Sequence, residues 1–129
     1  MTIDDFELLK LIGKGGYSQV FMARKKDSGQ MYAIKIMDKK HLLSCMTPSA
    51  IVREVEINRK CQKKSLFVID LYWAFQNETK LFLVMDLCVG GQLFYFLSQR
   101  DKLTEGMASF YIVEVMEALE ILHSQNMLY

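Results

Sequence analysis

The most informative stretch of the chain reads Gly13-Lys14-Gly15-Gly16-Tyr17-Ser18-Gln19-Val20 and lies between two segments of β-strand composition. Glycines allow a backbone to approach a phosphate closely and to adopt positive φ, so that N–H groups can cover the phosphate oxygens. A dinucleotide-binding fingerprint needs a helix directly after the glycines, whereas residues 20–23 have an extended pattern. A Walker A loop needs Gly-Lys-Ser or Gly-Lys-Thr at its end, and this ending is absent from the cluster. The cluster therefore predicts either an ordinary glycine hairpin or a strand-loop-strand lid over a nucleotide.

A lysine and a carboxylate follow this loop in the order that a nucleotide lid requires. Lys35 lies in a predicted strand, where the alternation of side chains places it on the same face as Ala33. A lysine among apolar neighbours is poorly solvated unless it is paired, and Glu54 on the next predicted helix is the candidate partner. The alternative is a lysine on an exposed strand edge. The loop, the lysine and the carboxylate together favour the nucleotide interpretation.

The strands are expected mainly in the first two thirds of the chain. The patterns predict strands at residues 6–12, 20–24 and 31–37, with turns at 13–16 and 27–29. Two apolar runs, 66–75 and 81–85, are joined by a polar turn at 77–79 and predict a hairpin of two largely buried strands.

The helices are expected mainly after the strands. Thr47-Pro48 predicts the start of a helix at about 49–61, because the hydroxyl can cap free N–H groups and proline suits the first helical position. Helical spacing of apolar residues predicts a short helix at 93–97 and a long one at 104–124. Strands first and helices second fit an α+β fold better than alternating α/β units.

The composition describes an ordinary globular domain. The chain has 129 residues, of which 51% are hydrophobic and 24% charged, with a formal net charge of +1. This balance argues against disorder and against a nucleic-acid-binding protein that depends on bulk basicity. Cys45, Cys61 and Cys88 are too widely separated for a disulfide framework or a zinc site, so no metal site is predicted.

No targeting segment or membrane span is predicted. The first residues carry neither a basic region nor an apolar stretch of signal-peptide type. The most membrane-like stretch, residues 81–97, is interrupted by Asp86, Gln92 and the pair Gly90-Gly91. We therefore expect an intracellular, cytoplasmic protein.

Taken together, these residues resemble the first half of a eukaryotic protein kinase domain. Gly13-x-Gly15-x-x-Ser18-x-Val20 is similar to the glycine-rich loop of that family, Ala33-Ile34-Lys35 to its Ala-x-Lys strand, and Arg53-Glu54 to the helix with the ion-pairing glutamate. Segments at 70–76, 83–87, 90–94, 108–111 and 118–124 resemble the AGC group of serine/threonine kinases. The resemblance implies an α+β, kinase-like fold: an antiparallel β N-lobe with one regulatory helix at 6–86, a hinge and linker at 87–91, and the start of a helical C-lobe at 92–129.

The resemblance also implies ATP as the ligand and assigns roles to individual residues. Ile12, Val20 and Ala33 would sandwich the adenine, with Met85 as gatekeeper behind it. The backbone of Asp86 and Cys88 would hydrogen-bond the adenine edge, and Gln92 the ribose. Lys35 would contact the α- and β-phosphates, held by Glu54. The loop residues that would complete the nucleotide site are Gly13, Gly15, Gly16 and Ser18.

Three positions depart from the family pattern. Ser18 replaces the third glycine of the loop, and Gln92 stands where AGC kinases usually carry glutamate. Glu56 follows Glu54 by two residues, and the loop to the next strand is slightly long for the Glu54 register. Glu54 is preferred as the partner of Lys35, because Val55 and Ile57 then fall on positions that the family keeps apolar. Glu56 is the alternative partner.

The sequence ends at Gln125-Asn126-Met127-Leu128-Tyr129, where the family continues into the catalytic loop. The resemblance implies that the catalytic aspartate and the Mg²⁺ ligands of the full-length enzyme are absent from this chain, which alone would be inactive. The long helix would then expose an apolar face that needs the missing C-lobe or a protein partner. The favoured hypothesis is the ATP-binding half of a kinase that transfers the γ-phosphate of Mg-ATP to Ser/Thr hydroxyls of a protein substrate. The alternative is a non-catalytic, kinase-like binding module that acts through protein partners; a Rossmann-type dehydrogenase ranks third.

Overall fold

The computed structural model of the chain describes residues 1–129 except 17, 46–47, 62–64, 101 and 128–129, and within helices it omits the side chains of 45, 48, 50, 51, 54, 58 and 61. After a short 3-10 turn, η1 (Ile3–Asp5), the elements are β1 (Phe6–Lys14), β2 (Ser18–Lys25), β3 (Met31–Asp38), α1 (Lys39–Cys45), α2 (Pro48–Cys61), β4 (Leu71–Gln76), β5 (Lys80–Met85), α3 (Leu93–Ser98) and α4 (Glu105–Ser124). The five strands form one antiparallel sheet in the order β1-β2-β3-β5-β4. The predicted α+β class is confirmed.

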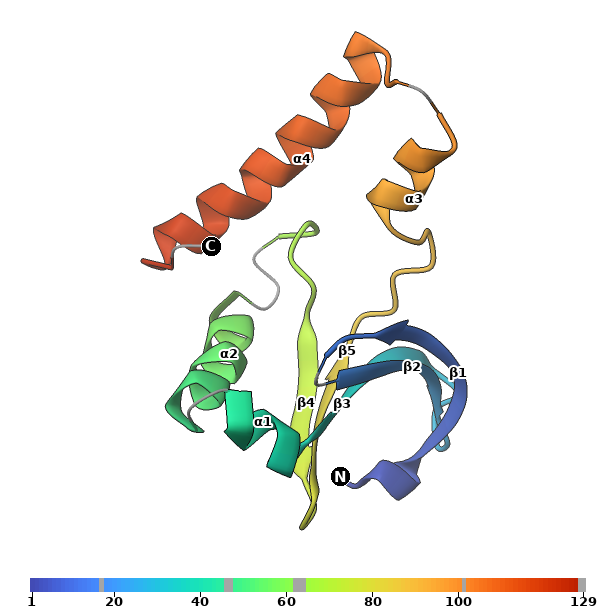
Figure 1. Ribbon diagram of the computed structural model, residues 1–129, viewed down its shortest axis with the longest axis vertical. Helices are drawn as coiled ribbons and strands as arrows, with labels where there is room; N and C mark the ends of the chain where they lie inside the picture. Colours follow the sequence, from blue (N-terminus) through green and yellow to red (C-terminus); the bar gives the residue numbers. More distant parts are fainter. Residues whose placement is uncertain (17, 46–47, 62–64, 101, 128–129) are drawn as a thin grey trace.

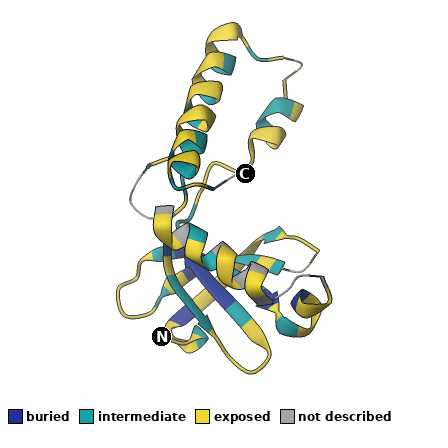
Figure 2. Ribbon diagram, turned by 90° about the vertical axis from the view of Figure 1, so that its left-hand side faces the viewer, coloured by how far each residue is buried: buried dark blue, intermediate teal, exposed yellow. Residues whose placement is uncertain are grey.

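Figure 1 shows the sheet in one half of the molecule, with α1 and α2 beside β4, and α3 and α4 in the other half. The buried residues lie in the sheet half (Figure 2). They form two clusters, one of Phe6, Ala23, Tyr32, Ile34, Phe82 and Val84, and one of Met37, Leu42, Leu71 and Leu83. Neighbouring residues of β3 are divided between the two clusters because side chains alternate along a strand. The second cluster packs on α1 and α2 through Leu42 and Val55.

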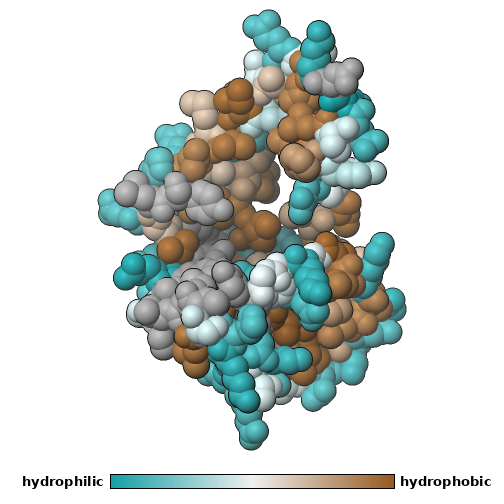
Figure 3. All heavy atoms as spheres, viewed as in Figure 1, coloured by the Kyte–Doolittle hydropathy of each residue, from teal (hydrophilic) through white to brown (hydrophobic). Residues whose placement is uncertain are grey.

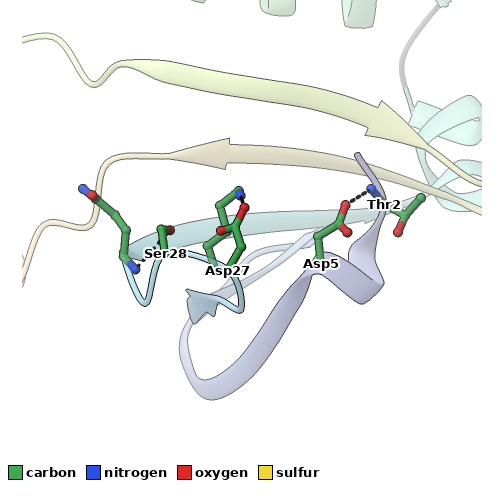
Figure 4. Close-up of polar contacts among 6 residues, drawn as sticks. Thr2, Asp5, Asp27 and Ser28 are labelled. Atoms are coloured by element: carbon green, nitrogen blue, oxygen red, sulfur yellow. Dashed lines mark hydrogen bonds and ion pairs between the residues drawn. The ribbon is translucent and has the colours of Figure 1, made fainter.

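The turn between β2 and β3 forms where residues 27–29 were predicted to turn. Gly29 has φ +70°, a conformation that glycine adopts without strain, and its N–H donates to the carbonyl of Lys25 at 2.8 Å. Figure 4 shows the Lys25–Asp27 ion pair within the turn and the bond from the Thr2 N–H to Asp5 Oδ2, 2.7 Å long. The hydrogen bond with Lys25 holds the pKa of the exposed Asp27 carboxyl below its usual value.

Three sequence predictions need correction. Residues 66–70 are not part of a strand: β4 begins at Leu71, and Leu66 is 99% exposed. Phe67 from this run instead lines an open cavity together with residues of α4. The hairpin is also less buried than predicted, since Leu71 is the one fully buried residue of β4. Finally, α1 was not predicted at all.

The helix predicted at residues 104–124 is confirmed as α4. Thr104 is its N-cap, and its Oγ1 accepts a hydrogen bond from the Met107 N–H at 3.3 Å. No residue of α4 is buried, and Figure 3 shows hydrophobic side chains on the surface of the helical half. The exposed apolar residues of α4 are Phe110, Ile112, Val113, Val115 and Met116. α4 therefore exposes apolar side chains, and their cover by a C-lobe or by a protein partner stays a prediction. Among the described residues, no helix has the length and apolar character to span a membrane.

Candidate functional site

The predicted lysine and three of the predicted adenine contacts lie on one face of the sheet. Residues directly opposite one another in antiparallel strands point to the same side. Val20 lies opposite Lys35, and Ala33 lies opposite Met85. Ala33 and Lys35 share a side because a single residue separates them on β3. The structure thus brings these four residues together on the side that packs on α1 and α2, with Ala33 buried and the others half-buried.

Ile12 lies at an irregularity in β1, next to the residue opposite Val20. Leu11 lies opposite Phe21 and Gly13 opposite Val20, so that β1 uses two steps where β2 uses one. Ile12 is the extra residue of this β-bulge, a feature that redirects a side chain. Ile12 is 44% exposed, so its apolar side chain is accessible to a ligand.

The glycine-rich segment is a tight connection between β1 and β2. The Gly15 N–H donates to the Ser18 carbonyl at 2.8 Å, and β1 extends through Lys14, two residues further than predicted. The expected positive φ is not found at Gly13, Gly15 or Gly16; among the described glycines it occurs at Gly29 and Gly91. A Cβ built on Gly16 would meet no atom within 4 Å. No described neighbour thus requires glycine at position 16, which leaves open space for an external group to approach the backbone.

The candidate carboxylates lie on α2. The side chain of Glu54 lies outside the described residues, so its predicted pairing with Lys35 stays a prediction. Glu56 is exposed and lines a cavity of about 310 Å³ together with Val52, Val55 and Arg59 from the same helix and with residues of β3, β4 and β5. Lys35 is not among the residues that line this cavity.

The chain leaves the sheet at Asp86, directly after β5, and the residues from Cys88 to Gln92 are exposed. Gly91 has φ +79°, and Gln92 is the N-cap residue of α3, where its carbonyl accepts from the Tyr95 N–H at 3.0 Å. The exposed thiol of Cys88 is unpaired among the described cysteines. The predicted adenine-binding segment therefore begins at the end of β5, directly after Met85.

Asp86 is held by a hydrogen-bond cluster that sequence reasoning missed. Its Oδ1 accepts from the Tyr72 hydroxyl at 2.7 Å and its Oδ2 from the Asp70 N–H at 2.9 Å, while its own N–H donates to the Asp70 carbonyl at 3.2 Å. The hydrogen bond to Asp86, with smaller effects of burial and nearby negative charge, raises the pKa of Tyr72 to about 12. No local pattern singles out Tyr72, because its role depends on strand pairing.

Comparisons with known proteins bear on this arrangement. The family model described as "Protein kinase domain" matches residues 6–129. Protein kinase 3 of Dictyostelium discoideum is 41% identical over 129 residues, which cover 100% of this chain and 14% of that protein. A RAC family serine/threonine-protein kinase homolog of the same organism is 39% identical, covering 98% of the chain and 28% of that protein. The human serine/threonine-protein kinase Sgk2 is 38% identical, covering 97% and 34%.

The chain spans about a third or less of the length of these relatives. The matched region runs from the first residue of β1 through α4, so it includes the whole sheet, the glycine-rich connection and Lys35. Its antiparallel sheet and following helices fit the N-lobe of a kinase and the first part of its helical C-lobe. The chain belongs to the protein kinase domain family, and its relatives are AGC-type serine/threonine kinases.

Proposed function

We propose that this chain is the ATP-binding part of a serine/threonine protein kinase that phosphorylates Ser/Thr hydroxyls of a protein substrate. The observation that carries the proposal is the shared face of Val20, Ala33, Lys35 and Met85, which lies beside the glycine-rich connection and ends at Asp86. An apolar surface suits a flat nucleotide base, and a lysine beside it suits the phosphates that the base carries. The backbone that follows β5 can supply hydrogen bonds to the edge of the base.

Each group has a chemical task in this proposal. Ile12, Val20 and Ala33 pack on the adenine, and Met85 limits the depth of the pocket. The carbonyl of Asp86 accepts from the 6-amino group, and the N–H of Cys88 donates to the ring. The Asp86 N–H already donates to the carbonyl of Asp70, so in the proposal Asp86 contacts the ligand through its own carbonyl and Cys88 supplies the donor.

The phosphates lie next to the sheet in this proposal. The backbone at Gly13, Gly15, Gly16 and Ser18 covers them, and the open space at Gly16 supports a close approach. Lys35 contacts the α- and β-phosphates, and Gln92 contacts the ribose. When bound, ATP supplies the γ-phosphoryl group and Mg²⁺ neutralises its charge. In the proposal the catalytic aspartate and the Mg²⁺ ligands lie outside this chain, which by itself transfers no phosphate.

We propose Glu54 as the partner of Lys35. Glu56 lines a cavity together with other residues of α2, and Lys35 does not line that cavity. This supports a role for Glu56 other than pairing with Lys35. The regions of the proposal are an N-lobe at 6–86, a hinge and linker at 87–91, and the start of a C-lobe at 92–129. An intracellular, cytoplasmic location belongs to the same proposal, because the reaction consumes ATP.

A second candidate is a non-catalytic module that acts through protein partners, and the exposed apolar residues of α4 favour it. In the kinase proposal the remaining C-lobe, or a protein partner, covers this face. The two candidates differ in nucleotide binding, because only the first one requires it.

Calorimetric titration of ATP into the chain tests the proposal. We expect binding that weakens about tenfold or more in Lys35→Ala, since a charge-assisted contact is lost. Lys102→Ala is the matched control, because Lys102 is exposed and lies in the connection between α3 and α4. Absent ATP binding, or equal affinity of wild type and Lys35→Ala, would contradict the site. Phosphate transfer by the chain alone that disappears in Lys35→Ala would contradict the placement of the catalytic residues outside it.

A further inference from the structure

A β-bulge places Tyr72 against the end of the neighbouring strand. Leu71 lies opposite Met85 and Trp73 opposite Val84, so Tyr72 is the extra residue of β4. Bulges redirect the side chain of the extra residue and are over-represented next to functional sites. Here the Tyr72 hydroxyl lies 2.7 Å from Oδ1 of Asp86, the residue that follows β5.

The bond from the Tyr72 hydroxyl is one of three hydrogen bonds that Asp86 makes with residues 70–72. The Asp70 N–H donates to the other carboxylate oxygen at 2.9 Å, and the Asp86 N–H donates back to the Asp70 carbonyl at 3.2 Å. Bonds to a carboxylate are shorter and stronger than bonds between neutral groups. Both the side chain and the backbone of Asp86 are therefore attached to the start of β4.

The tyrosine ring connects this cluster to the core. Its centroid lies 5.2 Å from the ring of Tyr32, in an edge-to-face arrangement, and 5.8 Å from the ring of Trp73. Tyr32 is buried in the first hydrophobic cluster. Among the described residues, none of 87–91 hydrogen-bonds to the sheet, so the bonds of Asp86 are the last such attachment before the exposed linker.

We infer that Tyr72 is a positioning residue for nucleotide recognition: by holding the Asp86 carboxylate, it orients the Asp86 carbonyl toward the 6-amino group of adenine. The inference rests on the proposed function, which assigns this carbonyl to the adenine edge. Tyr72 touches no part of the nucleotide; it acts through Asp86.

The test compares ATP with inosine triphosphate, which carries a 6-oxo group in place of the 6-amino group and cannot donate to the Asp86 carbonyl. Tyr72→Phe removes one hydroxyl and keeps the ring. We expect ATP binding to weaken about fivefold in this variant and inosine triphosphate binding to change by less than about twofold. A general loss of structure would weaken the binding of ATP and of inosine triphosphate to the same extent. Tyr95→Phe, at an exposed position of α3, is the matched control.

Amide hydrogen exchange of the nucleotide-free chain forms a second arm. The N–H groups of Asp70 and Asp86 should exchange several-fold faster in Tyr72→Phe, and Asp86→Asn should reproduce both effects because it removes the charge and one acceptor. An unchanged preference for ATP over inosine triphosphate, or unchanged exchange at Asp86, would overturn the inference. If the wild-type chain bound no ATP, that result would count against the proposed function, and exchange at Asp86 would then decide whether Tyr72 holds this segment.

Discussion

Replacing Ile34 by alanine tests whether the sheet half carries the stability of the chain. Ile34 is 0% exposed and lies in the cluster with Phe6, Tyr32 and Val84. The substitution deletes three carbon atoms, which at about 0.8 kcal/mol each gives about 2.4 kcal/mol of lost transfer free energy. A residual cavity adds to this value, so we expect a loss of about 3 to 4 kcal/mol in the free energy of unfolding.

The same substitution at Ile112 is the matched control. Ile112 is 57% exposed on α4, so little apolar area is lost, and alanine is the better helix former. We expect the free energy of unfolding to change by less than about 0.5 kcal/mol. The pair thus applies identical chemistry to a buried strand residue and to an exposed helix residue.

Urea unfolding followed by the fluorescence of Trp73 measures both effects. Trp73 is the one tryptophan of the sequence and packs against the cluster that contains Ile34, so its emission reports on the sheet. With a slope of about 1.5 kcal/mol/M, the Ile34→Ala midpoint should fall by about 2 M. A cost below about 1 kcal/mol for Ile34→Ala would refute the assignment of the core. An equal cost at Ile112 would show that its face of α4 is packed.

Two further predictions concern the proposed site. In a longer active form of the protein, Glu54→Lys should reduce phosphate transfer about a hundredfold by leaving Lys35 without its partner, and Glu56→Lys should change it less than about threefold; equal effects in a kinase assay would reject Glu54 as the partner. The Tyr72 hydroxyl should titrate near pH 12 in NMR spectra, and in Asp86→Asn its pKa should move back toward 10.0, the ordinary value for tyrosine. Because the folded-state pKa is raised, the stabilisation by the protonated hydroxyl is complete below about pH 10 and is lost as the pH rises through about 12; an unmoved titration in Asp86→Asn would contradict the assigned cause.

Four strands lie within about two residues of their predicted ends, because the alternation of side chains is a local signal, whereas β4 begins later than predicted. On β3, alternation alone separates Tyr32 and Ile34 from Met37, and the structure divides them between the two clusters in that way. The same reasoning placed Ala33 and Lys35 on one face before any pairing was known. Which strands pair, and therefore what lies opposite Lys35, is a long-range property that the alternation does not contain.

The missed helix α1 shows where local reasoning was incomplete. Its sequence is Lys39-Lys40-His41-Leu42-Leu43-Ser44-Cys45, and Leu42 is its one buried leucine, held by contacts with the sheet cluster. A start signal was nevertheless present, because Asp38 Oδ1 accepts from the N–H groups of Lys40 at 3.0 Å and His41 at 3.3 Å. An aspartate at the end of a predicted strand is a possible N-cap of a following helix, so the sequence contained a start signal for this element.

The site residues divide in the same way. Lys35 and the glycines were found from residue type and spacing, whereas the roles of Met85, Asp86 and Cys88 came from the family resemblance. The bulges at Ile12 and Tyr72 could not be predicted, since each is defined by a count of residues on two strands that are separate in the sequence. The bulge at Ile12 lies beside Gly13, the residue opposite Val20, and the bulge at Tyr72 brings the tyrosine hydroxyl to Asp86.

The segment after β5 joins the sheet half of the molecule to the helical half, and the two halves differ in how many of their residues are buried. The sheet half contains the buried residues and the face with Ala33, Lys35 and Met85, whereas α4 has no buried residue. The proposed nucleotide contacts therefore belong mainly to the half that contains the buried residues, and changes on the exposed surface of α4 should leave them in place. Asp86 differs, because it is attached to the sheet by hydrogen bonds and leads directly into the exposed linker. In the proposal, a change at Asp86 or Tyr72 should alter the orientation of the adenine in the pocket, so we expect these two positions to affect nucleotide preference more than positions on α4 do.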